Sequence, residues 1–200
     1  MAQMQLLAQA LTPTSVVYTP DWCARDMVAW FKPYGKVLEP CRGDDAIYKY
    51  LPKGSEWCEI DRGRDFFAWF EKVDFIISNP PFDAATFSDW LEHSFSLAPD
   101  IMYLLPIHFF FRSNSKVTRC RKLGWIKHVR FYGTGTDLGF PMGNPVAAMH
   151  FVRSYVGDTS WSWYAPNTAC TGRLTTSAQD QISTAGDILP AKVTRAKRRQ

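Results

Sequence analysis

Four short segments of the chain are mostly apolar, and each ends at, or directly before, an acidic residue, a serine or a proline. They are residues 36–40, 57–60, 73–78 and 101–105. A run that is apolar at nearly every position does not suit a sheet with one face in water, because alternate side chains of such a strand are polar. These runs are typical of buried parallel strands that are covered on both faces.

Segments with helical spacing lie between these runs. Apolar residues recur every three or four positions in residues 21–31 and 86–98, and a second short helix is predicted for residues 45–51. Strands that alternate with helices indicate a three-layer α/β domain with a mostly parallel sheet. Residues 127–131 and 147–155, which flank a glycine-rich turn, predict an antiparallel C-terminal pair that closes this sheet.

The 200 residues are enough for one domain of ordinary size. We expect a loose N-terminal lead-in over residues 1–15, a single domain over residues 16–165 and a disordered basic tail over residues 166–200. Residues 101–111 form the longest uncharged apolar stretch, about half of the roughly 20 residues that a membrane span needs. The start of the chain lacks the features of a secretory signal, so the expected location is the cytoplasm.

Charge is unevenly distributed along the chain. Residues 1–100 hold 9 basic and 15 acidic side chains, whereas residues 101–136 hold 7 basic and no acidic ones. A stretch with only positive charge favours a polyanionic partner that meets one face of the protein. A solvated basic loop is the alternative on charge alone.

Cysteine usage favours free thiols. The five cysteines are odd in number and contain no C-x-x-C pair, so neither a disulfide framework nor a zinc site is indicated, and we expect no metal. They are Cys23, Cys41, Cys58, Cys120 and Cys170.

Asn79, Pro80, Pro81 and Phe82 directly follow the third apolar run. Two consecutive prolines stiffen the backbone, and ligands of parallel α/β sheets bind beyond the carboxyl ends of the strands. The Asn79 amide oxygen and the Pro80 carbonyl can together accept two hydrogen bonds from one amino group, and Phe82 can stack on a flat heterocycle. An ordinary turn is the alternative for these four residues.

Four motifs occur in an order that resembles class I S-adenosylmethionine (AdoMet)-dependent methyltransferases. The sequence is most similar to DNA adenine-N-6 methyltransferases with an NPPF or NPPY motif, and it looks like a short orphan or phage-encoded member. The four motifs are Leu38-Glu39-Pro40-Cys41-Arg42-Gly43-Asp44, Glu59-Ile60-Asp61, Asp65-Phe66 and Asn79-Pro80-Pro81-Phe82.

The resemblance implies a role for each motif residue. Glu39, Pro40 and Gly43 would approach the methionine end of AdoMet, and Glu59 would bind the ribose hydroxyls. Asp65 would accept from the adenine amino group of AdoMet, and Phe66 would pack on that ring. Tyr18, Thr19 and Pro20 would close over the methionine, whereas Asn79, Pro80, Pro81 and Phe82 would form the catalytic motif.

Two departures from the family pattern stand out. Asp45 occupies a position where the family usually has a second glycine, which makes the loop less permissive. Only three residues separate Asp61 from Asp65, too few for the helix and strand that most relatives place there. We therefore expect a Rossmann-like methyltransferase fold that lacks one βα unit and has the Glu59 strand near an edge of the sheet.

The predicted activity is methyl transfer from AdoMet to the exocyclic amino group of adenine in DNA, after the base is flipped out of the duplex. RNA adenine or guanine amino groups are an alternative substrate, and a non-catalytic nucleic-acid-binding module is an alternative of another class. Trp161, Trp163 and Tyr164 either stack on bases or belong to the core. Phosphates would meet the basic stretch on the active-site edge, at Arg112, Lys116, Arg119, Arg121 and Lys122.

Overall fold

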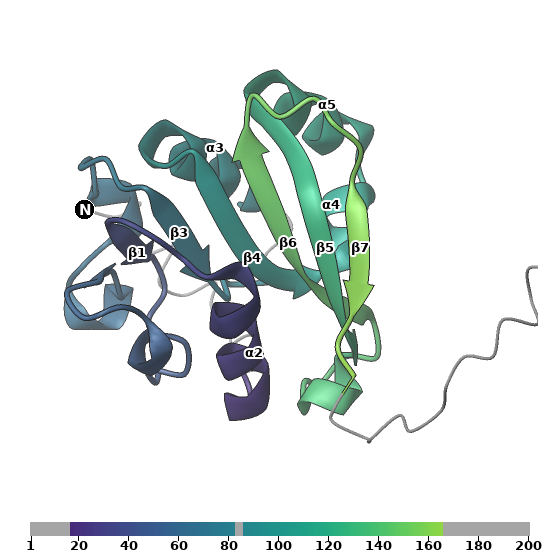
Figure 1. Ribbon diagram of the computed structural model, residues 1–200, viewed down its shortest axis with the longest axis horizontal. Helices are drawn as coiled ribbons and strands as arrows, with labels where there is room; N and C mark the ends of the chain where they lie inside the picture. Colours follow the sequence, from purple (N-terminus) through teal and green to yellow (C-terminus); the bar gives the residue numbers. More distant parts are fainter. Residues whose placement is uncertain (1–16, 83–85, 166–200) are drawn as a thin grey trace, which may run out of the picture. The chain divides into compact units, whose positions relative to one another are not determined.

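A computed structural model describes residues 17–82 and 86–165, and its centre is a seven-stranded sheet (Figure 1). The strand order is β2-β1-β3-β4-β6-β5-β7. The bounds of the strands are β1 (Val37–Glu39), β2 (Glu56–Trp57), β3 (Phe75–Ser78), β4 (Asp100–Pro106), β5 (Gly124–Thr134), β6 (Pro145–Arg153) and β7 (Ser160–Trp163).

Six of these strands run in the same direction. β1, β2, β3 and β4 pair in parallel, whereas β6 lies antiparallel between β4 and β5. β7 adds to the outer side of β5 and is parallel to it. The predicted mostly parallel sheet with an antiparallel C-terminal pair is therefore confirmed.

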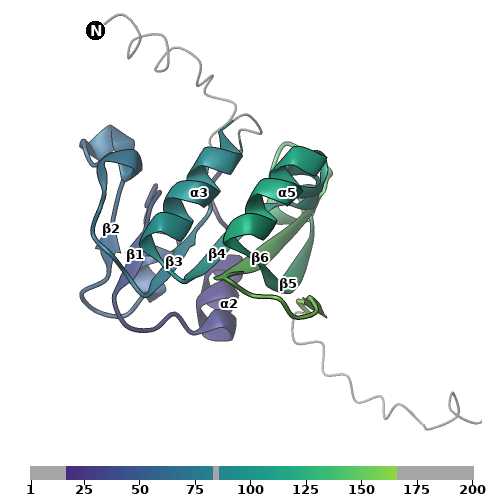
Figure 2. The same cartoon turned by 90° about the horizontal axis from the view of Figure 1, so that it is seen from above.

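Helices cover both faces of the sheet and make three layers (Figure 2). α2 (Asp21–Phe31) lies on one face, and α3 (Phe87–Leu97) and α5 (Asn114–Leu123) lie on the other. The short α4 (Ile107–Phe111) belongs to the same side as α3 and α5, because its Phe110 is buried in their core cluster. β1, β3 and β4 are buried almost throughout, as the apolar runs predict.

The predicted loss of one βα unit is also confirmed. β2 is only two residues long and forms an edge of the sheet. Two 3₁₀ turns, Ile60–Arg62 and Phe66–Ala68, are the regular elements that join it to β3. The structure thus passes from the second strand to the next buried strand without an intervening helix and strand.

Two local predictions are wrong. Residues 45–51 contain no α-helix but turns and one 3₁₀ turn, Tyr48–Tyr50. The reason is that Asp45 has φ +70°, a left-handed conformation that an α-helix does not contain. β7 is the other difference, because the sequence analysis treated Ser160–Trp163 as an aromatic cluster and not as a strand.

No helix within residues 17–82 and 86–165 is both long and apolar enough to cross a membrane. The lead-in over residues 1–15 and the tail over residues 166–200 lie outside the described residues, and so does Cys170. The expectations for those segments remain predictions.

Candidate functional site

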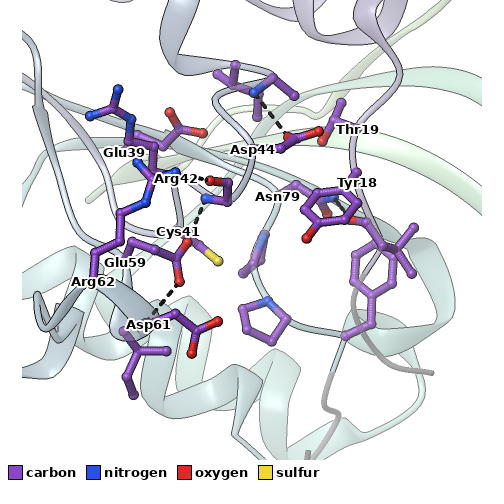
Figure 3. A pocket seen from close by; sticks show the side chains of 18 residues that line it. Tyr18, Thr19, Glu39, Cys41, Arg42, Asp44, Glu59, Asp61, Arg62 and Asn79 are labelled. Carbon is purple, nitrogen blue, oxygen red and sulfur yellow. Dashed lines mark hydrogen bonds between the residues drawn. The ribbon is translucent and has the colours of Figure 1, made fainter. Parts of the chain in front are cut away.

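A cavity of about 320 Å³ opens at the carboxyl ends of β1 and β3 (Figure 3). The chain turns from β1 to β2 on one side and crosses to β3 on the other, so the cavity lies where the strand order reverses, the usual ligand position in such sheets. Its lining residues are Val17, Tyr18, Thr19, Glu39, Cys41, Arg42, Gly43, Asp44, Ala46, Ile47, Glu59, Ile60, Asp61, Arg62, Asn79, Pro80, Pro81 and Phe82.

Glu39 is a buried carboxylate that lines this cavity. It is the last residue of β1 and is 1% exposed, and its Oε2 has no hydrogen-bond partner in the part of the chain that the structure describes. Burial raises the pKa of Glu39 well above its ordinary value, and the nearby Arg42 only partly opposes this. A buried acceptor without a donor is unfavourable unless a ligand completes it. Glu39 is therefore ready to accept hydrogen bonds from a cationic group.

Asn79 presents a second acceptor to the same cavity. Its Nδ2 donates a hydrogen bond of 2.9 Å to the Val17 carbonyl, which fixes the orientation of the amide. Its Oδ1 is buried and, among the described residues, has no partner. Because the donor end is tied to the backbone, the acceptor end is the one left for a ligand.

Glu59 holds the loop between β1 and β2. Its Oε2 accepts a hydrogen bond of 2.6 Å from the Gly43 backbone N–H, and its Oε1 lies 3.5 Å from the Asp61 nitrogen. Gly43 has φ +53°, a conformation in which glycine is favoured. The carboxylate that lies at the edge of the cavity thus also shapes the loop that forms its wall.

Asp45 keeps a glycine-like backbone with an aspartate side chain. Its left-handed φ is accompanied by two hydrogen bonds from Arg42, Nε to Oδ1 at 2.6 Å and a terminal nitrogen to Oδ2 at 3.1 Å. Arg62 adds a longer contact of 3.4 Å to Oδ1. The hydrogen bond from Arg42 is the main cause that lowers the pKa of Asp45. Asp45 therefore adopts a turn conformation that favours glycine, and its side chain is held by Arg42.

Arg42 and Arg62 are lining residues that sequence reasoning missed. The Arg42 guanidinium lies over the Tyr48 ring at 3.9 Å and over the Trp57 ring at 4.7 Å. Arg62 donates to the Gly43 carbonyl at 2.9 Å. Arg42 lies inside the first motif, and this position could have indicated that it lines the cavity. No motif or spacing in the sequence indicated this for Arg62.

Phe82 is supported by two other aromatic rings. Its ring stacks with Phe109 of α4 at a centroid distance of 6.0 Å and contacts Phe140 at 5.7 Å. Phe140 belongs to the connection between β5 and β6, far from Phe82 in the sequence. The Phe82 ring, which lines the cavity, is thus supported by two segments that are distant from it in the sequence.

Four residues predicted for the cofactor site do not line the cavity. Asp65 accepts a hydrogen bond from the Phe67 nitrogen at 2.9 Å, and Phe66 is 3% exposed and stacks on Trp90 at 4.8 Å. Pro20 precedes the first residue of α2, and Pro40 is buried next to β1. In the short link after Asp61, Asp65 caps a 3₁₀ turn and Phe66 fills the core beneath α3.

The basic stretch does not lie on one edge of the sheet. α5 leads back to the start of β5 at the amino edge of the sheet (Figure 1). Arg121 and Lys122 in its last turn therefore lie at the opposite edge from the carboxyl end of β3, which Asn79 follows. Arg119 pairs with Glu92 of α3 at 2.6 Å, and Arg130 is 6% exposed and pairs with Asp26 of α2 at 2.6 Å. The expectation that this stretch as a whole borders the active-site edge is therefore wrong.

Arg112 and Lys116 lie closer to the carboxyl edge. Arg112 follows α4, and Lys116 is in the first turn of α5. Of the five basic residues predicted to bind nucleic acid, these two are the ones placed toward the cavity side.

Cys41 lines the cavity, and burial raises its pKa to about 12, so its thiol is protonated at neutral pH. Cys23, Cys58 and Cys120 are free and buried, as expected. Within the described ranges, no group of three or more His, Cys, Asp or Glu side chains could hold a metal ion. The site therefore offers hydrogen-bond acceptors and aromatic surface.

No protein-family model and no curated protein matches the sequence. Several solved structures match the fold. A protein assigned as a modification subunit of a type I restriction enzyme from Vibrio vulnificus YJ016 covers 84% of this chain with a TM-score of 0.55 and 13% identity, and 51% of that protein is covered. The chain has a Rossmann-like methyltransferase fold.

Two further matches share this methyltransferase fold. A protein assigned as a class I S-adenosylmethionine-dependent methyltransferase from Listeria monocytogenes covers 84% of the chain with a TM-score of 0.56 and 13% identity, and 72% of it is covered. Magnesium protoporphyrin IX methyltransferase from Synechocystis PCC 6803, solved with bound SAM, covers 67% with a TM-score of 0.51 and 13% identity, and 79% of it is covered. The chain spans about half of the Vibrio subunit.

Proposed function

We propose that this protein is an AdoMet-dependent methyltransferase that methylates the exocyclic amino group of adenine in DNA. The observation that carries the proposal is that one cavity contains two buried acceptors without partners among the described residues, Glu39 Oε2 and Asn79 Oδ1. Glu39 Oε2 suits the cationic amino group of a cofactor, and Asn79 Oδ1 suits the amino group of a base. The methyltransferase fold of the chain supports this combination.

The residues present fit AdoMet. Glu39 would accept hydrogen bonds from the ammonium of its methionine part, which explains a buried carboxylate with a free oxygen. Glu59 would accept from the ribose hydroxyls at the edge of the cavity. Tyr18 and Thr19 line the opening on the side of Gly43, where they would cover the methionine part. The volume of about 320 Å³ lies within the ordinary range of small-molecule sites.

The chain itself would contribute positioning to the reaction. AdoMet, when bound, supplies an electrophilic methyl group on a sulfonium. Asn79 Oδ1 and the Pro80 carbonyl would accept the two hydrogens of the adenine amino group and leave its lone pair free for attack. Phe82 would stack on the ring of the base and hold its plane. Such positioning can supply a large part of a rate enhancement without an ionisable base.

RNA is an alternative substrate. Asn79 and Pro80 would recognise an amino group and not the sugar, so the same residues could orient an adenine or guanine amino group of RNA. Nothing in the cavity lining distinguishes these substrates by itself, and the assay must therefore include them.

A non-catalytic nucleic-acid-binding module is the alternative of another class. Its support is that Asp65 and Phe66 do not reach the cavity. Against it, Asp45 keeps the left-handed turn that a glycine would give, and Glu39 keeps a free buried oxygen. Both features are expected of a cavity that binds a ligand.

The test is a methyl-transfer assay with tritiated AdoMet on duplex DNA, single-stranded DNA and RNA of the same sequence. We expect label in DNA, recovered as N-6-methyladenine after hydrolysis, and a loss of at least about 100-fold for Asn79→Ala, because a missing hydrogen bond to a reacting group costs roughly this much. Asn114→Ala, which changes an exposed asparagine at the start of α5, is the matched control.

Binding measurements separate the alternatives. Isothermal titration with AdoMet should show binding to the wild type and to Asn79→Ala alike, since Asn79 contacts the base. Label in RNA only would replace the DNA substrate by RNA. Nucleic-acid binding without AdoMet binding would leave the non-catalytic module as the remaining alternative. Activity of Asn79→Ala equal to that of the wild type would refute the mechanism.

A further inference from the structure

Two tryptophans of the edge strand β7 are exposed next to a phenylalanine of β5. Trp161 is 53% exposed and Trp163 is 70% exposed. The Phe131 ring stacks with Trp163 at a centroid distance of 4.2 Å and an interplanar angle of 25°, and with Trp161 at 5.6 Å and 16°. Trp161, Phe131 and Trp163 therefore form a row of roughly parallel rings, called the aromatic row below.

The aromatic row lies on the face of the sheet that carries α4 and α5. Phe131 packs against the core cluster that contains Phe110 of α4 and Cys120 of α5. The serines that alternate with the tryptophans point to the other face, where Ser160 and Ser162 form hydrogen bonds with His128 at 2.6 and 2.8 Å. The row is thus a surface feature beside the two helices.

The two tryptophans of the row are not part of the hydrophobic core. Tyr164, one residue further on, shows the contrast, because it stacks on Trp22 at 4.8 Å and packs against the core cluster on the α2 face. Large aromatic side chains that remain half or more exposed in a row are unusual on a surface without a partner. Of the two alternatives for the C-terminal aromatics, packing in the core applies to Tyr164. Stacking on bases is left for Trp161 and Trp163, which are exposed.

The elements around the aromatic row are basic. α4, α5, β5 and β7, together with Arg112 between the two helices, contain seven Lys and Arg residues and no Asp or Glu. Arg119 and Arg130 are paired with acidic residues of α3 and α2. The positive charges of Arg112, Arg121, Lys122 and Lys127 favour a polyanion over an apolar protein segment as the partner.

We infer that the aromatic row binds unpaired bases of a nucleic-acid strand, with its phosphates near the cations of the α4–α5 side. Aromatic rings of a protein stack on bases whose faces are free, at about 1–3 kcal/mol per base. A duplex offers few such faces, so the row should distinguish single strands from duplexes. The inference rests on the proposed function in one respect, since the bound strand would also present its adenine to Asn79.

The fold places one end of the row, Trp163, toward the edge of the sheet that holds the cavity. β7 is parallel to β5, and Trp163 at its end is in register with Phe131 near the carboxyl end of β5. β3 and β7 are separated by β4, β6 and β5, which makes four strand spacings, or roughly 19 Å. A stacked strand with a rise of about 3.4 Å per nucleotide would cover this distance in about six nucleotides.

The test measures fluorescence anisotropy of a labelled oligonucleotide of about 16 nucleotides, single-stranded and as a duplex. Trp163→Ala and Trp161→Ala should each weaken binding of the single strand roughly 5- to 150-fold. Duplex binding should change much less. Phe70→Ala is the matched control, because Phe70 is 76% exposed and lies in the link between β2 and β3.

Trp163→Phe keeps an aromatic ring and should recover most of the affinity, whereas Trp163→Leu should not. Equal binding of the single strand by wild type and both alanine variants would overturn the inference. A shift of the sedimentation coefficient in the alanine variants, from dimer to monomer, would also overturn it, because a second copy would then cover the row.

AdoMet titration of the same variants keeps the two proposals apart. Binding of single strands that depends on Trp163 without any AdoMet binding would refute the proposed function alone. Methyl transfer that continues unchanged in Trp163→Ala and Trp161→Ala, with unchanged affinity for single strands, would refute the aromatic row alone.

Discussion

Glu39 and Asn79 each leave one buried oxygen without a partner in the described chain. For a folded protein without ligand such groups lower stability, because their hydration is lost and nothing replaces it. Such groups are nevertheless found in sites that bind ligands. Substitutions that replace them often stabilise the protein and weaken its function. Glu39 shows the conflict most clearly, because burial also raises its pKa.

Glu39→Gln should therefore stabilise the unliganded protein and weaken AdoMet binding. The folded pKa of Glu39 is raised above its unfolded value, so wild-type stability is full at acidic pH and falls as the pH rises above about 4.5 toward the folded pKa. The variant lacks this loss, and we expect its free energy of unfolding at neutral pH to exceed that of the wild type by about 1 kcal/mol or more. Each kcal/mol corresponds to a rise in Tm of ~2–4 °C for a chain of this size.

Thermal unfolding of both proteins between acidic and slightly alkaline pH checks this expectation. The difference in Tm should grow as the pH rises. Isothermal titration should show that AdoMet affinity of the wild type increases with pH, since a carboxylate binds the ammonium better than a carboxylic acid. A Tm difference that is constant across this range would contradict the role of Glu39 ionisation.

Asp45 allows a test of backbone conformation. Alanine is usually more stabilising than glycine by roughly 0.5–1 kcal/mol, but at φ +70° a Cβ atom is unfavourable. Both Asp45→Ala and Asp45→Gly lose the contacts with Arg42, so the difference between them isolates the backbone. We expect Asp45→Gly to be the more stable of the two by about 1 kcal/mol in urea unfolding. The opposite order would mean that the loop relaxes away from the left-handed turn.

The buried strands β1, β3 and β4 and the helices α2 and α3 could be predicted because their signal is local. The apolar runs led to β1, β3 and β4, and the three- and four-residue spacing led to α2 and α3. The cavity lining at Glu39, Gly43, Glu59 and Asn79 followed from the order of the motifs and the rule for strand ends. The lining at Tyr18 followed from the family resemblance alone.

The failures arise where distant contacts decide the conformation. The left-handed turn at Asp45 depends on Arg42 and on a loop held by Glu59, and propensity for a helix could not reveal it. Asp65 and Phe66 were displaced from the cavity by the short link before them. The Ser-Trp alternation of β7 was a strand signal with period two, and the aromatic content of the segment hid it.

α2 is connected to β5 by an ion pair that is largely buried. Asp26 and Arg130 form two hydrogen bonds of 2.6 and 2.9 Å, and the Tyr132 hydroxyl donates to Asp26 at 2.7 Å. The Asp26 side chain is 20% exposed and the Arg130 side chain is 8% exposed. Because α2 covers the face of the sheet next to the cavity, this pair fixes a helix that begins just after Thr19 and Pro20.

Asp26→Asn should lower the free energy of unfolding by about 3 kcal/mol, because it leaves the Arg130 charge buried without a counter-charge. Arg130→Gln added to it should restore part of this loss. Arg119→Gln is the control, since its pair with Glu92 is exposed and such pairs contribute up to ~1 kcal/mol. Equal effects of the two single changes in chemical unfolding would contradict the importance of burial.

The molecule separates its charges between two regions. The cavity is lined by Glu39, Asp44, Glu59 and Asp61 against two arginines, an environment that suits a cation. Arg112 and the elements α5 and β5 carry the opposite charge. The cavity therefore suits a cationic cofactor, whereas Arg112 and Lys116, which lie toward the same edge, suit the phosphates of a polyanion.

Binding of nucleic acid should weaken steeply with salt, because each phosphate contact releases a counterion. Arg112→Gln should reduce the slope of log K against log salt by about 1, since Arg112 lies toward the cavity side. Lys122→Gln, in the last turn of α5 at the amino edge, should change the slope less. Titrations at several salt concentrations check this, and equal slopes for the two variants would place the bound phosphates elsewhere.

The hydrogen bond from Asn79 to the Val17 carbonyl has a consequence for how the chain can be shortened. A protein that starts at Tyr18 would keep every residue of the proposed catalytic motif and every strand of the sheet. It would nevertheless lose the only fixed reference for the Asn79 amide within the described residues, which could then rotate by half a turn and offer its nitrogen in place of its oxygen. The Val17 carbonyl, which lies outside every regular element, thus determines that the Asn79 amide presents its oxygen, and not its nitrogen, to the cavity.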